Sequence, residues 1–166
     1  MITFQVRNMM QKVQKDFYCS PQDATEFLST LKSEPGMFCE YTLDAEGRLE
    51  DAYWATAEQQ KKCVTYGGCI QLDTTVLVCR YGCLLLFVGV DSENRSCILG
   101  YSLLRSECTE IFEWILDKYC RASGGRRPKV VLSDADLAIT AAVKTSWPST
   151  LHLYCLWHIF KNMAKK

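Results

Sequence analysis

Residues 129–134 are Lys129-Val-Val-Leu-Ser-Asp134, an apolar run that closes on a carboxylate. Its uninterrupted Val-Val-Leu centre predicts a strand that is buried on both faces of a sheet. A second strand-like run, Cys69-Ile-Gln-Leu-Asp73, also reaches an aspartate. Ligand sites of open α/β sheets gather at strand ends, so these two carboxylates can meet at one edge. We expect Asp73 and Asp134 to lie roughly 4–7 Å apart, within reach of a shared cation.

The segments around these two runs predict an alternation of strands and helices. Strands are expected over residues 69–75, 84–91, 97–104, 129–133 and 150–154, and helices over 108–121 and 137–144. The resulting order, β-β-β-α-β-α-β, predicts an α/β fold with a ribonuclease H-like mixed sheet and helices packed on it. In this order the strands that carry Asp73 and Asp134 lie side by side.

Residues 1–66 differ in character and are expected to form a small N-terminal region of helices and a hairpin. Ser20-Pro21 is typical of a helix start, and Pro35-Gly36 ends that helix. Two strand-like runs flank the turn Asp44-Ala-Glu-Gly47, where glycine permits a positive φ. The predicted domains are therefore 1–66 and a ribonuclease H-like core over 67–166, which is incomplete at its C-terminus.

The composition is that of a globular protein in a reducing compartment. Hydrophobic residues make up 48% of the 166-residue chain, and the net charge is zero. No signal peptide and no run of about 18 apolar residues occurs, so no membrane span is expected. The ten cysteines include no Cys-x-x-Cys pair, and Cys79, Cys83 and Cys97 lie in apolar strand-like runs, where a free thiol behaves as a small hydrophobic group. We expect free thiols and a nuclear or cytoplasmic location.

Basic residues gather in two places, although a domain that grips DNA alone is normally basic overall. The clusters consist of Arg121, Arg126, Arg127 and Lys129, and of Lys161, Lys165 and Lys166. Clusters of this kind indicate a solvent-exposed face, and contact with nucleic acid is the alternative.

The two aspartates predict a site for a hard cation. Carboxylate oxygens favour Mg²⁺ or Mn²⁺, and two such ions activate a nucleophile and stabilise the leaving oxygen of a phosphodiester. That chemistry normally requires a third carboxylate, but no Asp or Glu follows Asp136 in the sequence. Asp136 itself is expected to be the N-cap of the following helix. Glu107 is the candidate third ligand, with Glu110 beside it. If either completes the site, the chain is a ribonuclease H-like nuclease; the competing interpretation is that both stabilise a helix N-terminus.

A softer set of ligands follows in His152, Cys155 and His158, which include both histidines of the chain. Zinc requires four ligands, or three and a water, so we expect hydrogen bonding and packing here and no zinc site. Trp157 is either a core residue or a platform on which a base stacks. His158 is expected to open a final helix.

Together these residues resemble the Mutator-like (MULE) transposase domain, which is shared with the far-red-impaired-response family of transposase-derived plant regulators. The resemblance runs over roughly residues 48–160, and its motifs are specific as a set. They are Arg48-Leu through Trp54, Asp73-Thr-Thr, Phe87-Val-Gly-Val90, Leu99-Gly-Tyr-Ser-Leu-Leu104, Glu107, Phe112-Glu-Trp114, Pro128 through Asp136, Trp147-Pro148 through His152, and Cys155-Leu-Trp-His158.

The resemblance implies a DDE-type transposase that cleaves and transfers DNA strands at transposon ends. It implies that Asp73 and Asp134 are catalytic metal ligands and that Cys155 and His158 form the family's Cys-x-x-His element. The family's third acid, a glutamate, lies beyond an inserted helical region, and this sequence ends before that point. We therefore expect a fragment that binds Mg²⁺ or Mn²⁺ weakly and does not cleave DNA. The alternative is a non-catalytic, DNA-associated regulator.

An incomplete domain has a physical consequence for the surface. Part of the sheet should expose an apolar patch larger than a monomer normally tolerates. We therefore expect the chain to self-associate.

Overall fold

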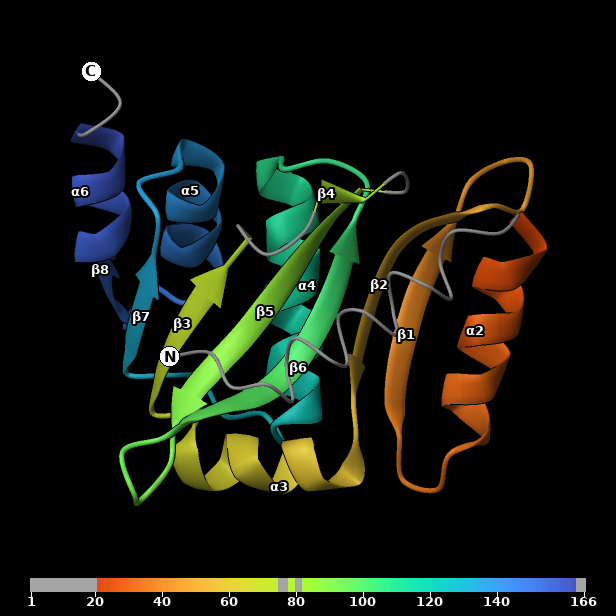
Figure 1. The fold of residues 1–166 in the computed structure, drawn as a ribbon, viewed down its shortest axis with the longest axis horizontal. Coiled ribbons are helices and arrows are strands. Elements are labelled where there is room, and N and C mark those ends of the chain that lie inside the picture. Colours follow the sequence, from red (N-terminus) through yellow and green to blue (C-terminus); the bar gives the residue numbers. More distant parts are fainter. Residues whose placement is uncertain (1–20, 75–77, 80–81, 164–166) are drawn as a thin grey trace.

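The computed structural model describes residues 21–74, 78–79 and 82–163, which form one eight-stranded mixed sheet and five helices (Figure 1). The strands are β1 Phe38–Leu43, β2 Leu49–Ala55, β3 Cys69–Asp73, β4 Val78–Cys79, β5 Gly82–Val90, β6 Ser96–Leu104, β7 Val130–Ser133 and β8 Leu151–Tyr154. The helices are α2 Pro21–Ser33, α3 Ala57–Tyr66, α4 Thr109–Ala122, α5 Leu137–Ser146 and α6 Leu156–Met163. None of the helices in the described ranges is long and apolar enough to cross a membrane.

The strands follow the order β1-β2-β6-β5-β3-β7-β8, with β4 paired to β5. Neighbours from β1 to β3 are antiparallel, whereas β3, β7 and β8 are parallel. The path β6-β5-β3-β7-β8, with α4 leading into β7 and α5 leading into β8, is the ribonuclease H-like arrangement (Figure 1). The predicted fold class is confirmed, including the pairing of the two strands that carry aspartates.

One face of the sheet lies beneath α4 and α5 (Figure 1). Aromatic rings pack in the core between these helices and the strands. Phe87 of β5 stacks on Tyr119 of α4 with ring centroids 4.8 Å apart, and it meets Tyr53 of β2 edge-on at 5.6 Å. Tyr119 also lies 5.8 Å from Trp147, at the end of α5. Rings in such contact bury large apolar areas, so they fix α4 and α5 against the strands.

The opposite face is covered at one end by α2. Leu28 of α2 is buried in a second apolar cluster together with Trp54 of β2. The Trp54 ring meets Phe27 edge-on at 5.6 Å and stacks on Tyr101 of β6 at 5.5 Å. Successive residues of a strand face opposite sides of a sheet, which explains why Tyr53 and Trp54 belong to different clusters.

β1 and β2 form the predicted hairpin, and β2 continues into the main sheet by pairing with β6. Asp44 closes the turn, because its Oδ1 accepts hydrogen bonds from the N–H groups of Arg48 and Glu46 at 2.8 and 3.0 Å. Gly47 has a φ of 76°, a conformation that glycine adopts without steric cost. The turn residues therefore account for the hairpin.

Some details differ from the expectation. The sequence pattern does not predict β4, because a strand of two residues has no detectable period. The last helix begins at Leu156, so His158 lies within its first turn and does not open it. Ser20 and Thr75, which mark an expected helix start and an expected strand end, lie outside the described residues.

Candidate metal site at the ends of two parallel strands

Asp73 and Asp134 lie at the carboxyl ends of β3 and β7, which are neighbours in the sheet. Gln71 pairs with Leu132 in this parallel ladder. Asp73 lies two residues after Gln71, and Asp134 lies two residues after Leu132. Because successive side chains of a strand face opposite sides of the sheet, both aspartates lie at the same level and on the same face. Both aspartates are partly exposed. A cation site shared by the two aspartates requires this register. The distance between their carboxylates stays a prediction.

The loop after β7 is anchored by the cap of α5. Asp136 is the predicted N-cap, and its Oδ1 accepts hydrogen bonds from the N–H groups of Ala138 and Ile139 at 2.8 and 3.0 Å. The N–H of Asp136 points in turn to Asp134 Oδ1, at 3.3 Å. That hydrogen bond is long and therefore weak. The cap fixes the backbone of the loop more firmly than it fixes the Asp134 carboxylate.

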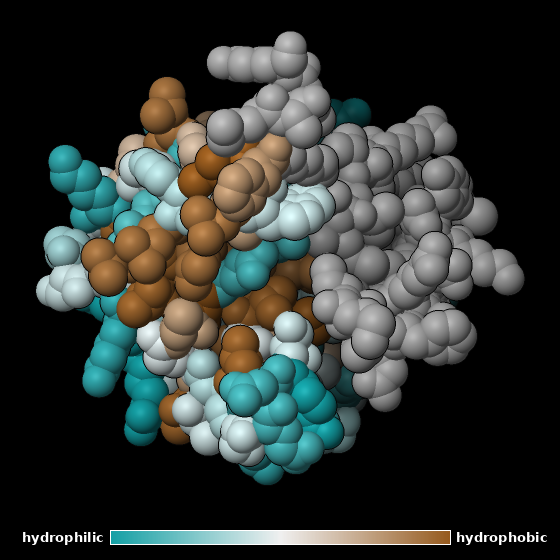
Figure 2. All heavy atoms as spheres, turned by 60° about the vertical axis from the view of Figure 1, so that its left-hand side comes forward, coloured by the Kyte–Doolittle hydropathy of each residue, from teal (hydrophilic) through white to brown (hydrophobic). Residues whose placement is uncertain are grey.

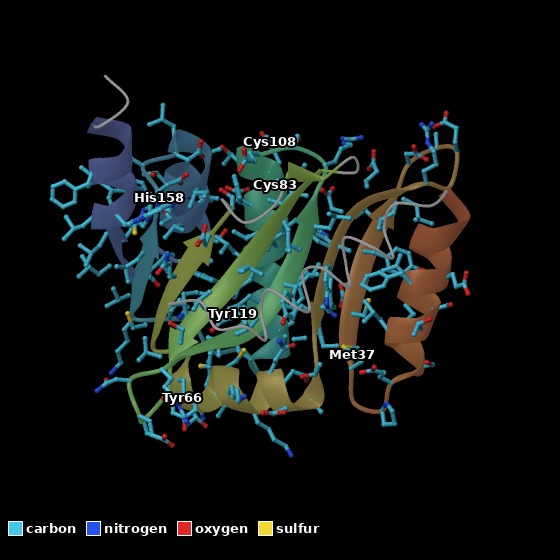
Figure 3. All side chains as sticks on the ribbon, viewed as in Figure 1. Met37, Tyr66, Cys83, Cys108, Tyr119 and His158 are labelled. Atoms are coloured by element: carbon cyan, nitrogen blue, oxygen red, sulfur yellow. The ribbon has the colours of Figure 1, made fainter. Side chains whose placement is uncertain are left out.

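Glu107 lies between β6 and α4 and approaches the end of β3 through Cys83. The Cys83 thiol, 9% exposed at the start of β5, lies 3.2 Å from the Thr74 carbonyl oxygen and 3.7 Å from Glu107 Oε1. Thr74 follows Asp73 directly, so Glu107 lies beside the edge at which β3 ends. Figure 3 shows Cys83 at the same end of the sheet as Cys108, the N-cap residue of α4.

His152, on β8, contacts the strand end that carries Asp134. Its Nε2 lies 2.8 Å from Oγ of Ser133, which is fully buried directly before Asp134. Burial lowers the pKa of His152 below its ordinary value of 6.5, and the nearby negative charge of Asp134 partly offsets this effect. The imidazole is therefore neutral at neutral pH.

Cys155 and His158, the predicted Cys-x-x-His pair, lie at the junction of β8 and α6. Cys155 is half-buried, and its N–H donates to the Ser133 carbonyl oxygen at 2.6 Å. His158 is buried, and its ring lies 4.7 Å from that of Trp157. Trp157 is 58% exposed, which excludes the interpretation that it is a core residue.

The described residues contain the pair of aspartates but no group of three His, Cys, Asp or Glu side chains able to hold a metal ion. Sequence reasoning assigned Cys83 a purely apolar role and overlooked Ser133. The antiparallel pairing of β3 with β5 is the feature that places Cys83 beside the end of β3. The feature of the sequence that could have pointed to Ser133 is its position directly before Asp134, at the end of a buried strand.

The first basic cluster lies away from this edge. Arg126, Arg127 and Lys129 are exposed just before β7, whereas Asp134 follows the other end of that strand. Arg121 forms an ion pair with Glu40 at 2.6 Å. The exposure of this cluster agrees with a solvated face and equally with a contact to nucleic acid, so both interpretations stay predictions. The side chains of the second cluster lie outside the description.

Comparison with known proteins matches residues 69–162 to the MULE transposase domain. The chain is 32% identical over 142 residues to Protein FAR-RED IMPAIRED RESPONSE 1 of Arabidopsis thaliana. It is 30% identical over 142 residues to Protein FAR1-RELATED SEQUENCE 4 of the same plant. Each alignment covers 84% of this chain, which spans only 17% and 19% of the length of these two relatives.

A weak likeness to a solved structure involves the HTLV-2 integrase catalytic core domain in complex with magnesium, in its trimeric form. The identity is 14%, the TM-score is 0.32, and the likeness covers 57% of this chain and 64% of that chain. A similarity of this size does not bear on function. The family match, in contrast, spans the strands β3 to β8 and the whole candidate site. The chain belongs to the MULE transposase domain family, as the sequence resemblance predicts.

Proposed function

We propose that this chain is a transposase-derived domain that holds a divalent cation weakly through Asp73 and Asp134. By descent it comes from an enzyme that cleaves and transfers DNA strands, and the family match supports that ancestry. The observation that carries the proposal is the parallel register of β3 and β7, which supports a common site for the two carboxylates. Carboxylates are hard oxygen ligands that suit Mg²⁺ or Mn²⁺, and a bound ion supplies charge neutralisation at a phosphodiester.

Glu107 is the candidate third ligand. Its carboxylate is on the exposed side of the loop before α4, and its contact with the Cys83 thiol is the weak type that sulfur makes. A rotation of this side chain toward the end of β3 therefore costs little. Glu107 would add one oxygen ligand to those of Asp73 and Asp134, which is few for holding two ions in place.

We infer that the 166-residue chain binds a cation without cleaving DNA. DNA, including transposon ends, is the proposed partner, and a nuclear or cytoplasmic location agrees with it. A second candidate function is that of a non-catalytic, DNA-associated regulator. It is favoured by the lack of a three-ligand metal cluster within the described ranges.

Titration with Mn²⁺, followed by electron paramagnetic resonance, tests the site. We expect weak binding to the wild-type chain and none to Asp73→Asn or Asp134→Asn, because each substitution removes a charged oxygen ligand. Glu93→Gln, an exposed acid in the turn between β5 and β6, is the matched control and should bind like the wild type. Binding that persists in both aspartate variants would refute the site.

Nicking of supercoiled plasmid DNA in Mn²⁺ tests the proposed inactivity. We expect no nicking by the wild-type chain. Metal-dependent nicking that disappears in Asp73→Asn would instead establish an active nuclease, and its loss in Glu107→Gln would identify the third ligand. DNA binding that is retained in Asp73→Asn, with no nicking, would favour the regulator.

A further inference from the structure

Ser133 occupies a special position, because it is the last residue of β7 and directly precedes Asp134. It is fully buried, and besides its pairing in the strand ladder it takes part in three hydrogen bonds. Its carbonyl oxygen accepts from the Cys155 N–H at 2.6 Å. Its hydroxyl donates to the Asp134 carbonyl oxygen at 2.7 Å and lies 2.8 Å from His152 Nε2. His152 of β8 and Cys155, the residue directly after β8, therefore fix the point at which the chain leaves β7 toward the candidate site.

The Ser133 hydroxyl has a single proton, and this determines which group donates in the hydrogen bond between Ser133 and His152. A serine hydroxyl has one proton to donate and two lone pairs that accept. A carbonyl oxygen can only accept, so a hydroxyl proton directed to the Asp134 carbonyl oxygen calls for the tautomer of His152 in which Nε2 carries a hydrogen and donates it to Ser133. The resulting relay runs from His152 through Ser133 to the peptide group of Asp134.

We propose that His152 is a positioning residue for the metal site, because through Ser133 it orients the Asp134 peptide group and with it the Asp134 carboxylate. Among the described residues, that carboxylate accepts the long hydrogen bond from the Asp136 N–H, at 3.3 Å. The backbone is therefore the main support for the direction of the Asp134 side chain. The inference rests on the proposed function, since it assigns His152 a role in the same cation site.

Mn²⁺ titration of the whole chain tests this role with three substitutions. His152→Leu removes the donor and Ser133→Ala removes the hydroxyl, and each should weaken Mn²⁺ binding roughly tenfold, as is usual for groups that orient metal ligands. His152→Gln places an amide N–H at the reach of Nε2 and should bind within about twofold of the wild type. The double variant His152→Leu/Ser133→Ala should be no weaker than either single variant, because both break one relay.

A merely structural role would give a different pattern. It would lower the urea midpoint of His152→Leu while the folded variant kept wild-type affinity for Mn²⁺, and that result would overturn the inference. Additive losses in the double variant, or no recovery in His152→Gln, would also overturn it. If His152→Leu does not fold, the Mn²⁺ affinities of Ser133→Ala and His152→Gln still test the inference. The ¹⁵N shifts of His152 give a readout without metal, and a hydrogen on Nδ1 instead of Nε2 would contradict the relay.

Failure of the inference and failure of the proposed function give different results. Wild-type chain that binds no Mn²⁺ overturns both. Binding that is lost in Asp134→Asn but unchanged in His152→Leu and Ser133→Ala overturns the positioning role alone.

Discussion

At the scale of single residues, burial governs which groups of the core can ionise. Cys63 of α3 is 3% exposed, and its thiol lies 3.2 Å from the Leu99 carbonyl oxygen. Burial raises the pKa of Cys63 from 9.0 to about 11. It also raises the pKa of Tyr101 from 10.0 to about 12, and the pKa values of Tyr53 and Tyr119 rise for the same reason. The fold therefore requires a neutral thiol and neutral phenols in its interior.

We expect the fold to lose stability in alkaline solution. The unfolded chain ionises Cys63 near pH 9.0, whereas the fold keeps it protonated up to about pH 11. The contribution of the protonated thiol to stability is fully present below pH 9.0 and is lost as the pH rises to about 11. For a pKa shift of this size, the loss in the free energy of unfolding is roughly 2–3 kcal/mol. Urea denaturation at about pH 8 and about pH 10.5 measures the loss.

Two serine variants provide the comparison for this pH effect. Cys63→Ser keeps a donor toward Leu99 but does not titrate, so it should reduce the pH dependence. Cys69→Ser changes an exposed thiol and should leave the dependence as in the wild type. The same pH dependence in both variants would contradict the assignment to Cys63.

At the scale of the elements, the sequence predicted the pieces whose causes are local. The apolar run before Asp134 forms β7, and Asp136 caps α5. Both features depend on neighbours within a few residues. The contact of Cys83 with Glu107 and that of Ser133 with His152 join residues 24 and 19 positions apart, so they depend on the register between strands. A short run of residues does not encode that register, so the detail of the site could not be predicted.

The end of α3 gives a prediction for two adjacent glycines. A Cβ on Gly67 would clash with the Cys63 carbonyl oxygen and lie 2.6 Å from the Tyr119 hydroxyl, whereas a Cβ on Gly68 would meet nothing within 4 Å. Overpacking of this kind costs roughly 1–3 kcal/mol, so Gly67→Ala should lower the free energy of unfolding by that amount. Gly68→Ala should stay within about 0.5 kcal/mol of the wild type. Urea denaturation of both variants measures this difference. If the two variants were equally stable, neighbouring groups would have moved to relieve the crowding, and the prediction would be wrong.

At the scale of the whole molecule, apolar side chains are exposed on one side. Figure 2 turns the α6 and β8 side forward and shows hydrophobic residues gathered there. The exposed members of this apolar face are Leu137, Leu151, Leu153, Tyr154, Leu156, Trp157 and Phe160. Residues 145–160 contain no Asp, Glu, Lys or Arg. Two copies of this face could therefore meet without repulsion between like charges, and β8 is the last strand of the described sheet.

We expect the chain to self-associate through this apolar face, with a second copy as the partner. Sedimentation velocity should show a mass that rises with concentration. Leu156→Glu and Phe160→Glu should each shift the chain toward the monomer, because each places a charge in the apolar contact. Leu43→Glu, at an exposed leucine of β1, is the control and should not change the association. A monodisperse wild-type monomer would contradict this prediction.

The parallel pairing of β3 with β7 also determines when the candidate site can exist as the chain folds. β3 and β5 are close in sequence and can pair early, whereas Cys69 and its partner Val130 are about sixty residues apart. Closing so long a loop loses conformational entropy before any contact compensates for it. On a ribosome, Asp73 emerges well before β7 and the Asp134 that follows it. The proposed cation site can therefore exist only in the finished domain, and an ion bound there would stabilise the product of folding without guiding its early steps.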